Sequence, residues 1–363
     1  MREMLRTEAK VRSLKAERKG IVKNGGRAAA KRSSALAQRI ERVRAAGHVW
    51  RCFGDGIAFE YLDNYALKQT YYSVERPKVK QRAGFLTGKE GLAGEIAYLE
   101  ELLEREVPAL LVDLTDTIRH GDICVLVGPD THLIEVKAGS GLDARGRRQR
   151  DGLLKLQKLF DTDEAEGLRG FPVMTRRVQF GSPDVTYVDE LNTCIATALK
   201  DGQASVSPEG GVHYVALTEA GPGIEHAFAA LKLDRPWVLS LNEFKAEHAW
   251  APYYPFVLSI VAEASLWAFV RGDVYLMVVI EPRTFTDAIS EAGYVGEFDF
   301  ANEDYPLSVK DKAGNEITKI SRGYLKRVAL EFVSPRWLVK SALEVIGRRH
   351  AGGTPSSEDE ALR

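Results

Sequence analysis

The sequence predicts an α/β (α+β) fold whose central part, residues 49–182, follows the order helix, strand, strand, strand, helix, strand. Three observations predict this order. Apolar side chains recur at helical spacing in two segments, 88–106 and 145–160. Three runs of β-type residues lie between these segments, and a fourth run follows the second one. With 363 residues and 45% hydrophobic content, the chain is long enough to bury a core of this kind.

Each element of this order has its own signal. The first helix is predicted by GKEGLAGEIAYLEELLERE (88–106), which places Leu92, Ile96, Leu99 and Leu103 on one face. The strands are PALLVDLTDTI (108–118), GDICVLV (121–127) and THLIEVKAG (131–139), and Gly128-Pro129-Asp130 predicts a tight hairpin between the last two. Helical spacing returns through Leu153, Leu156 and Phe160, and PVMTRRVQF (172–180) is the closing strand.

Segments of different character flank this core. Residues 1–48 form a basic helical arm with a break at Asn24-Gly25-Gly26 and an end near Gly47, and HVWRCFGDGIAFEYLD (48–63) predicts a short strand and a helix. Residues 183–348 form an α+β C-terminal half with helices over 188–199, 256–270 and 337–348 and strands at VHYVAL, WVLSLNEF and VYLMVVIE. The tail, 349–363, is small, polar and acidic, which predicts disorder.

The arm carries most of the charge asymmetry of the chain. It holds fourteen Lys and Arg against four Glu, so its formal charge is +10, and because the whole chain is −1 the remainder is −11. Basic arms contact nucleic acid or another acidic surface. A solvated helix, or a coil that binds a partner protein or a second copy of the chain, accounts for the same charge, and these alternatives stay open.

Cysteine usage and hydropathy indicate the compartment. Cys52, Cys124 and Cys194 lie far apart with no CxxC or Cys/His ligand spacing, so we expect neither a disulfide framework nor a zinc site. The basic start lacks the apolar core and cleavage site of a secretory signal. The apolar segment 256–270 is shorter than the roughly 20 residues that a membrane span needs. These observations predict a cytoplasmic protein without a membrane partner.

The residues that point to chemistry are Glu135 and Lys137, at the end of the third predicted strand. Side chains two apart on a strand share a face, so a carboxylate and an ammonium point the same way. A turn centred between Pro129 and Asp130 pairs Asp122 with Lys137 and Cys124 with Glu135, which makes Asp122 and Glu135 diagonal neighbours. Diagonal carboxylates can converge on one cation with oxygen ligands, and this favours magnesium.

Other acidic pairs fit less well. The spacing Glu-x-Lys also occurs at Glu8 and at Glu243. Asp130 lies in the turn, five residues from Glu135, and that odd spacing aims it at the other face, so we interpret it as a turn former. Asp234 precedes Glu243 by nine residues with no turn between them, which would separate them by roughly 30 Å along one strand.

A helix, a GDI-type strand, a turn and an apolar strand ending in Glu-x-Lys resemble the PD-(D/E)xK nuclease superfamily, whose core is the restriction-endonuclease-like αβββαβ fold. The resemblance covers roughly residues 85–181. It implies that Asp122 and Glu135 bind Mg²⁺, for which Mn²⁺ can substitute, and that Lys137 lies near the attacking water and the scissile phosphate. Gly121 stands where the family has its proline, a residue that supplies no ligand.

The same resemblance suggests further site residues. Many members add a glutamate from the helix before the strands, and Glu95 is the candidate because it lies on the apolar side of that helix, where a carboxylate needs a partner. Gln149, one turn before Leu153, is similar to a glutamine of these nucleases. A basic cluster at the start of the second helix is expected to contact the nucleic-acid backbone, namely Arg145, Arg147, Arg148 and Arg150.

The leading hypothesis is therefore a metal-dependent nuclease that hydrolyses phosphodiester bonds, with DNA as the expected substrate and RNA not excluded, in restriction, phage defence or repair. A second hypothesis is a non-catalytic nucleic-acid-binding or assembly subunit that keeps the nuclease fold. A third is a structural protein that binds a partner, in which the motif matches are coincidental. The sequence does not distinguish single-stranded from double-stranded substrates, one metal from two, or the oligomeric state.

Overall fold

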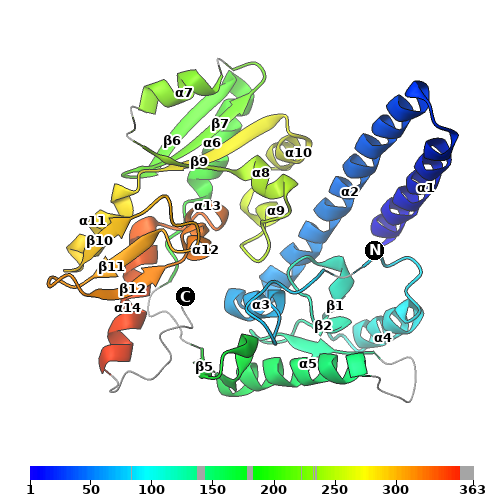
Figure 1. Ribbon diagram of the computed structural model, residues 1–363, viewed down its shortest axis with the longest axis horizontal. Coiled ribbons are helices and arrows are strands. Elements are labelled where there is room, and N and C mark those ends of the chain that lie inside the picture. The colour runs from blue at the N-terminus through cyan, green and yellow to red at the C-terminus, as the bar shows by residue number, and fades with distance from the viewer. Residues whose placement is uncertain are drawn as a thin grey trace. The chain divides into compact units, whose positions relative to one another are not determined.

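The computed structural model describes residues 1–82, 84–136, 144–177, 183–221, 223–231, 233 and 235–351. These residues form two compact units, Met1–Pro172 and Val173–Arg363. Both units combine helices with small antiparallel sheets, which agrees with the predicted α+β class (Figure 1). The tail was expected to be disordered, and its residues from 352 on lie outside the described part of the chain. Within the described part, no helix combines the length and the apolar content needed to cross a membrane.

The first unit begins with a helical hairpin made of α1 (Arg2–Asn24) and α2 (Arg27–Tyr61). The break predicted at 24–26 is confirmed, because Gly25 and Gly26 take positive φ values of 64° and 89° that favour glycine. Apolar side chains fill the seam between the two helices: Val11, Leu14, Leu36 and Ile40. The predicted arm is therefore a packed hairpin, and most of its Lys and Arg residues are exposed.

The predicted end of the arm near Gly47, and the short strand after it, are wrong, because α2 continues unbroken to Tyr61. Glycine here permits close packing. A Cβ on Gly47 would meet the Thr7 methyl at 3.3 Å, and one on Gly54 would lie 2.0 Å from the Leu114 carbonyl oxygen. Tertiary contact explains these glycines, whereas local sequence rules count them as helix breakers.

Beyond α2 and α3 (Asn64–Tyr71), the central helix, three strands and helix appear in the predicted order. They are α4 (Leu92–Glu104), β1 (Ala109–Leu111), β2 (Ile123–Val125), β3 (His132–Ile134) and α5 (Ala144–Thr162), with a 3-10 turn η1 (Val112–Leu114) after β1. The sheet order is β1-β2-β3, with both pairs antiparallel. Leu156, Leu159 and Phe160 of α5 pack with Leu133 of β3.

The predicted hairpin register is wrong, because the turn is centred one residue earlier than predicted. Cys124 pairs with Leu133 and Ile123 with Ile134, so Cys124 does not face Glu135. The turn centres between Gly128, whose φ is +79°, and Pro129, whose carbonyl accepts a hydrogen bond from the Asp63 amide. Because this shift moves each pairing by two residues, every side chain keeps its predicted face.

The closing strand of the predicted core does not extend this sheet within the described residues. The short strand β5 (Met174–Arg176) lies at the start of the second unit, and the β1-β2-β3 sheet has three strands. In the first unit, α5 is followed by β4 (Glu164–Glu166) and a 3-10 turn η2 (Leu168–Gly170). The described residues therefore support the coarser α+β description, and the αβββαβ assignment stays a prediction.

The second unit is built on an antiparallel sheet of order β6-β7-β9-β8. Its strands are β6 (Gln203–Glu209), β7 (Val212–Thr218), β8 (Trp237–Ser240) and β9 (Val274–Ile280). On one face, Val215 and Leu217 pack with α7 (Ile224–Leu231). On the other, Cys194 of α6 (Val188–Asp201) donates to the Tyr214 carbonyl. The predicted helix over 188–199 and the strands VHYVAL and VYLMVVIE are confirmed.

Two predictions for this unit need correction. The strand WVLSLNEF ends at Ser240, whose hydroxyl caps α8 (Leu241–Ala246) by accepting from the Glu243 amide. The apolar helix over 256–270 is divided into α9 (Phe256–Ser259) and α10 (Glu263–Arg271). The Asn192 side chain supports the break, because it donates to the Ser259 carbonyl and accepts from the Val261 amide.

A second small sheet completes this unit. Its order is β10-β11-β12, with strands β10 (Val295–Phe298), β11 (Leu307–Lys310) and β12 (Glu316–Ile320). The remaining helices are α11 (Arg283–Glu291), α12 (Arg322–Leu325), α13 (Arg327–Leu330) and α14 (Pro335–Ala351). The last of these confirms the predicted closing helix.

Candidate metal centre

Three carboxylates of the first unit converge on one ammonium group. Lys89 Nζ lies 3.0 Å from a Glu95 carboxylate oxygen, 2.9 Å from Asp113 Oδ2 and 3.1 Å from Asp122 Oδ1. The carboxylates come from three different elements, the helix α4, the turn η1 and the residue that precedes β2. We call Lys89, Glu95, Asp113 and Asp122 the acidic cluster.

The fold brings these carboxylates together through short connections. Asp113 lies in η1 directly after β1, and β1 pairs with β2, so Asp113 and Asp122 lie at the same end of the two strands. The Val112 amide donates to the Asp122 carbonyl at 2.9 Å and extends this pairing by one residue. On the other side, the Asp122 amide donates to the Ile134 carbonyl at 2.8 Å, and Asp122 Oδ2 accepts from the Val136 amide at 3.0 Å. Asp122 is therefore held by hydrogen bonds to Val112 on one side and to Ile134 and Val136 on the other.

Gly121 has a specific reason to stand where the family motif has a proline. Its φ is +77°, and a Cβ there would lie 3.0 Å from the Ile134 carbonyl oxygen. Proline is held near φ −65° and cannot take this conformation. The way in which this chain directs Asp122 into the acidic cluster therefore requires glycine.

The helical hairpin positions the lysine. Glu8 is a buried carboxylate of α1 whose oxygens accept from the amides of Leu86 and Thr87 at 3.0 and 2.8 Å. Arg12, one turn later, donates to the Thr87 carbonyl. These bonds hold the 85–88 turn that leads into Lys89. The arm thus has a structural role beside any role of its charge.

The acidic cluster combines burial with an excess of negative charge. Glu95 is 3% exposed and is the one residue of α4 that is fully buried. Burial raises the pKa of Glu95 despite its hydrogen bond from Lys89, and the charges of Asp122 and Asp113 raise it further. Burial opposes protonation of Lys89, but hydrogen bonds to Asp113 and Glu95 raise its pKa above the usual value. Three carboxylates thus share one described cation, an arrangement that accepts additional positive charge.

This donor set fits magnesium. Mg²⁺ prefers carboxylate oxygens and keeps several waters, and its oxygen ligands converge on a single point. The Lys89 ammonium lies at such a point, within hydrogen-bonding distance of three carboxylates. The side chains of Lys89 and Asp122 keep exposed fractions of 31% and 16%, so the acidic cluster is open to solvent.

The structure places the predicted site residues unequally. Asp122 and Glu95 lie in the acidic cluster, and Glu135 lies partly buried next to Val136, whose amide binds Asp122. Gln149 is partly buried on α5, and Arg147, Arg148 and Arg150 are exposed on the same helix. Lys137 and the side chain of Arg145 lie outside the described residues.

Two members of the acidic cluster escaped the sequence analysis. Asp113 follows the apolar run ALLV directly, and an aspartate at the end of a buried strand is a signal that could have identified it. Lys89 lies in the turn before the predicted helix and carries no motif. Its role depends on the hairpin that holds this turn, which a local pattern does not reveal.

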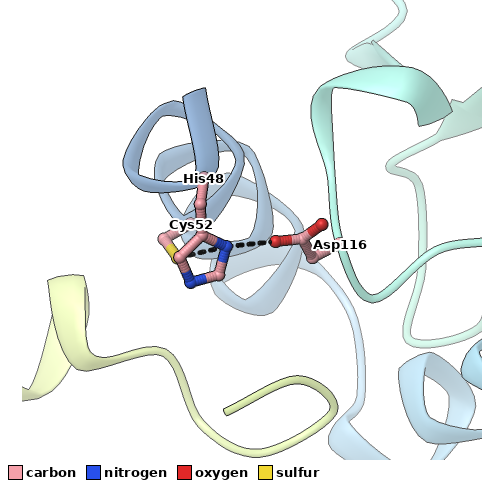
Figure 2. A group of neighbouring side chains, drawn as sticks. All are labelled: His48, Cys52 and Asp116. Carbon is pink, nitrogen blue, oxygen red and sulfur yellow. Dashed lines mark hydrogen bonds and ion pairs between the residues drawn. The ribbon is translucent and has the colours of Figure 1, made fainter. Parts of the chain in front are cut away.

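A second group of side chains, His48, Cys52 and Asp116, also escaped the sequence analysis, and we call it the His-Cys-Asp cluster. All three are buried, and their candidate ligand atoms lie within 4.8 Å of one another. Figure 2 shows His48 and Cys52 on successive turns of α2, with the Asp116 carboxylate facing the imidazole. The expectation of no Cys/His ligand spacing is wrong, because the four-residue spacing of His48 and Cys52 places both on one face of a helix. The prediction of a short strand at the start of residues 48–63 hid this shared face, because His48 and Cys52 were not expected to lie on one helix.

Known proteins add nothing to this geometry. A scan against protein-family models, a search of curated proteins and a search of solved structures each returned no match to this chain.

Proposed function

We propose that this protein is a Mg²⁺-dependent nuclease whose metal is held by Asp122, Asp113 and Glu95, with Glu135 beside them. The observation that carries the proposal is the convergence of three carboxylates on Lys89 Nζ, at distances of 2.9–3.1 Å. A lysine matched to one carboxylate is an ordinary ion pair. Three carboxylates around one ammonium leave a net negative charge, which favours a divalent cation at the same place.

The carboxylates and the lysine of the acidic cluster would have different roles in the reaction. When bound there, Mg²⁺ would polarise a phosphoryl oxygen and lower the pKa of a bound water. Asp122 orients its carboxylate through the hydrogen bond from the Val136 amide, which leaves Oδ1 directed at the cation position. Lys89 is charged and partly exposed, so on metal loading its ammonium can leave the carboxylates and neutralise a substrate phosphate. The resemblance assigns that role to Lys137 as well.

The arginines of α5 and the exposed basic residues of the α1–α2 hairpin support a polyanionic substrate. Contacts to phosphate supply affinity without reading sequence. Both groups lie in the first unit together with the acidic cluster. We propose DNA as the substrate, with RNA as a competing outcome of the test.

One observation favours a second function, a non-catalytic subunit that retains the fold. The Lys89 ammonium itself occupies the point where the carboxylates converge. In such a subunit, Lys89 replaces the metal permanently and turns the acidic cluster into an ion-pair network that supports the fold.

The deciding experiment incubates the full chain with linear, circular and single-stranded DNA and with RNA, in millimolar Mg²⁺ and in EDTA. The nuclease proposal expects cleavage that requires the metal and is lost in Asp122→Asn. The matched control is Glu101→Gln, because Glu101 is an exposed glutamate on α4 paired with Arg105. Binding without cleavage of any substrate would support the non-catalytic subunit.

A further inference from the structure

The His-Cys-Asp cluster is built from two elements far apart in the sequence. His48 and Cys52 belong to α2, and Asp116 follows η1. His48 Nδ1 lies 2.6 Å from Asp116 Oδ2, and Cys52 Sγ lies 4.0 Å from His48 Nδ1 and 3.5 Å from Nε2. The exposed fractions of the three residues are between 2% and 5%, so the cluster is enclosed.

We propose that His48, Cys52 and Asp116 bind a zinc ion that links α2 to the segment that carries η1. Imidazole nitrogen, thiolate sulfur and carboxylate oxygen are the three donor types of protein zinc sites. The same mixture is unsuited to magnesium, which takes oxygen ligands and keeps its waters. The donor chemistry therefore distinguishes this site from the acidic cluster and makes the inference independent of the proposed nuclease activity.

The distances are close to those of a tetrahedral ion. Zinc bonds of about 2.0–2.3 Å imply donor–donor separations of roughly 3.3–3.6 Å. The nitrogen–oxygen separation of 2.6 Å is shorter than this, and the nitrogen–sulfur separation of 4.0 Å is longer. Both of these separations differ from the tetrahedral values by less than about 1 Å, and all the donor atoms lie within 4.8 Å of one another. Binding would release two protons, the one on the Cys52 thiol and the one between Nδ1 and Oδ2.

An unpartnered oxygen supports the proposal independently. Asp116 Oδ1 is buried and has no hydrogen-bond partner among the described residues. A buried polar atom without a partner is costly, and a cation beside the carboxylate removes this cost. The second oxygen, Oδ2, is 3.2 Å from the Arg82 guanidinium, so only Oδ1 is left without a partner.

The loop that carries Asp116 is fixed by a residue outside the ligand set. Asp55, one helical turn after Cys52 on α2, accepts from the Asp116 amide at 3.0 Å and from the Thr117 amide at 2.8 Å. The same helix thus supplies two ligands and a carboxylate that orients the third. Supporting hydrogen bonds of this kind are typical of metal sites.

The competing interpretation is a nucleophilic cysteine activated by a histidine and an aspartate. Access argues against it, because Cys52 is 5% exposed and a substrate carbon cannot approach Sγ. Reactive cysteines lie in partly exposed surroundings. A structural metal has no such requirement.

The test uses the full chain, stripped with EDTA, desalted and titrated with Co²⁺ as a spectroscopic probe. The proposal expects a thiolate-to-cobalt charge-transfer band that saturates at one equivalent and is bleached by Zn²⁺. Cys52→Ala should abolish the band. His48→Ala and Asp116→Asn should weaken cobalt binding by more than the about 10–100-fold that loss of an outer-shell partner costs. Cys194→Ala, which removes a buried thiol of the second unit, is the matched control and should keep the band.

The wild-type spectrum decides the question even where a variant does not fold. A wild-type chain without the charge-transfer band at excess Co²⁺ overturns the proposal, as does a band that persists in Cys52→Ala. Rapid alkylation of Cys52 in the native metal-free chain, without a cobalt band, overturns it in favour of the nucleophile. Asp122→Asn and millimolar Mg²⁺ should leave the band unchanged, so failure here and failure of the nuclease proposal give different results.

Discussion

The acidic cluster and the His-Cys-Asp cluster lie in the same unit and each take an aspartate from one short segment, Asp113 and Asp116, yet they differ in chemistry. The first has oxygen donors and a partly exposed lysine. The second has nitrogen, sulfur and oxygen donors, and the side chains of His48 and Asp116 are 4% and 1% exposed. Burial and donor type together therefore separate a centre that can meet a substrate from one that can support the fold.

The main chain from Asp113 to Asp116 supports both clusters. Gly54 of α2 lies against the Leu114 carbonyl, and Arg51 donates to the Asp113 carbonyl at 3.3 Å. The helix thereby holds the main chain between the two aspartates. A change that loosens the His-Cys-Asp cluster should therefore disturb the acidic cluster through this segment, whereas the reverse effect should be weak, because the acidic cluster lies nearer to solvent.

The largest effect is expected from Asp116→Ala. It removes a buried carboxylate that both His48 and Arg82 contact, and loss of one member of a buried charged pair such as Asp116–Arg82 costs about 3–5 kcal/mol of the free energy of unfolding. Urea unfolding in EDTA measures it. Asp161→Ala, an exposed aspartate on α5, should change stability by no more than about 0.5 kcal/mol. A loss below about 1 kcal/mol for Asp116→Ala would show that the His-Cys-Asp cluster does not support the fold.

Asp122→Asn should affect cleavage and leave the fold largely intact. The amide oxygen can still accept from the Val136 amide, but the charge that would hold a metal is gone. Loss of one preorganised electrostatic group costs on the order of 10²–10³ in kcat, and we expect a loss of this size under single-turnover conditions. Near-wild-type Mg²⁺-dependent cleavage by this variant would remove the acidic cluster from the mechanism.

Lys89→Met separates the two functions proposed for the acidic cluster. Without the ammonium, three carboxylates face one another, and we expect a loss of about 1–3 kcal/mol in EDTA. Millimolar Mg²⁺ should then raise Tm more in the variant than in the wild type, because the ion binds the folded state alone. If Mg²⁺ leaves the Tm of Lys89→Met unchanged, the lysine has replaced the metal and the non-catalytic function is favoured.

The pH dependence of stability should report on Asp55. Burial, and then the negative charge of Asp116, raise the pKa of Asp55 to about 8, against the hydrogen bonds that it accepts. Because the folded-state pKa exceeds the unfolded value of about 3.9, the stabilisation is complete below about pH 4 and is lost as the pH rises through 8. Between pH 5.5 and 9 the metal-free chain should lose several degrees of Tm, at about 2–4 °C for each kcal/mol. Asp55→Asn should flatten this decline, and an equally steep decline in that variant would assign it to another group.

The smallest effect at any one salt concentration is expected from the arm. Deleting it would also remove Glu8 and the α1–α2 core, so charge neutralisation is the cleaner change. Five exposed residues are replaced by Gln, namely Lys10, Lys19, Arg27, Lys31 and Arg39. If all five contact phosphate, the slope of log affinity against log salt on duplex DNA should become shallower by roughly four. An arm that binds a partner protein or a second copy predicts an unchanged slope with a changed molecular mass.

The elements whose signals are local could be predicted from the sequence. The break at Gly25-Gly26, α4, the hairpin β2–β3, α5 and the strands β7 and β9 follow from turn residues and from periods of 3.6 and 2. The sequence also singled out Asp122, as the expected diagonal neighbour of Glu135 across the hairpin, and Glu95, because a carboxylate on an apolar face requires a partner. That partner, Lys89, could not be predicted, since it reaches the carboxylates from a turn whose Leu86 amide binds Glu8, 78 residues before Leu86.

Features that depend on contact between distant segments could not be predicted from local patterns. Glycines 47 and 54 look like helix breakers locally, but they allow α2 to pack closely against α1 and η1, and α2 therefore runs through them. This continuity places His48 above Cys52 and brings Asp116 to both. The hairpin turn is centred one residue earlier than predicted, at a place where the Asp63 amide donates to the Pro129 carbonyl, a contact that the turn sequence does not contain. Periodicity assigns a residue to a face, and only packing decides which other residue meets it there.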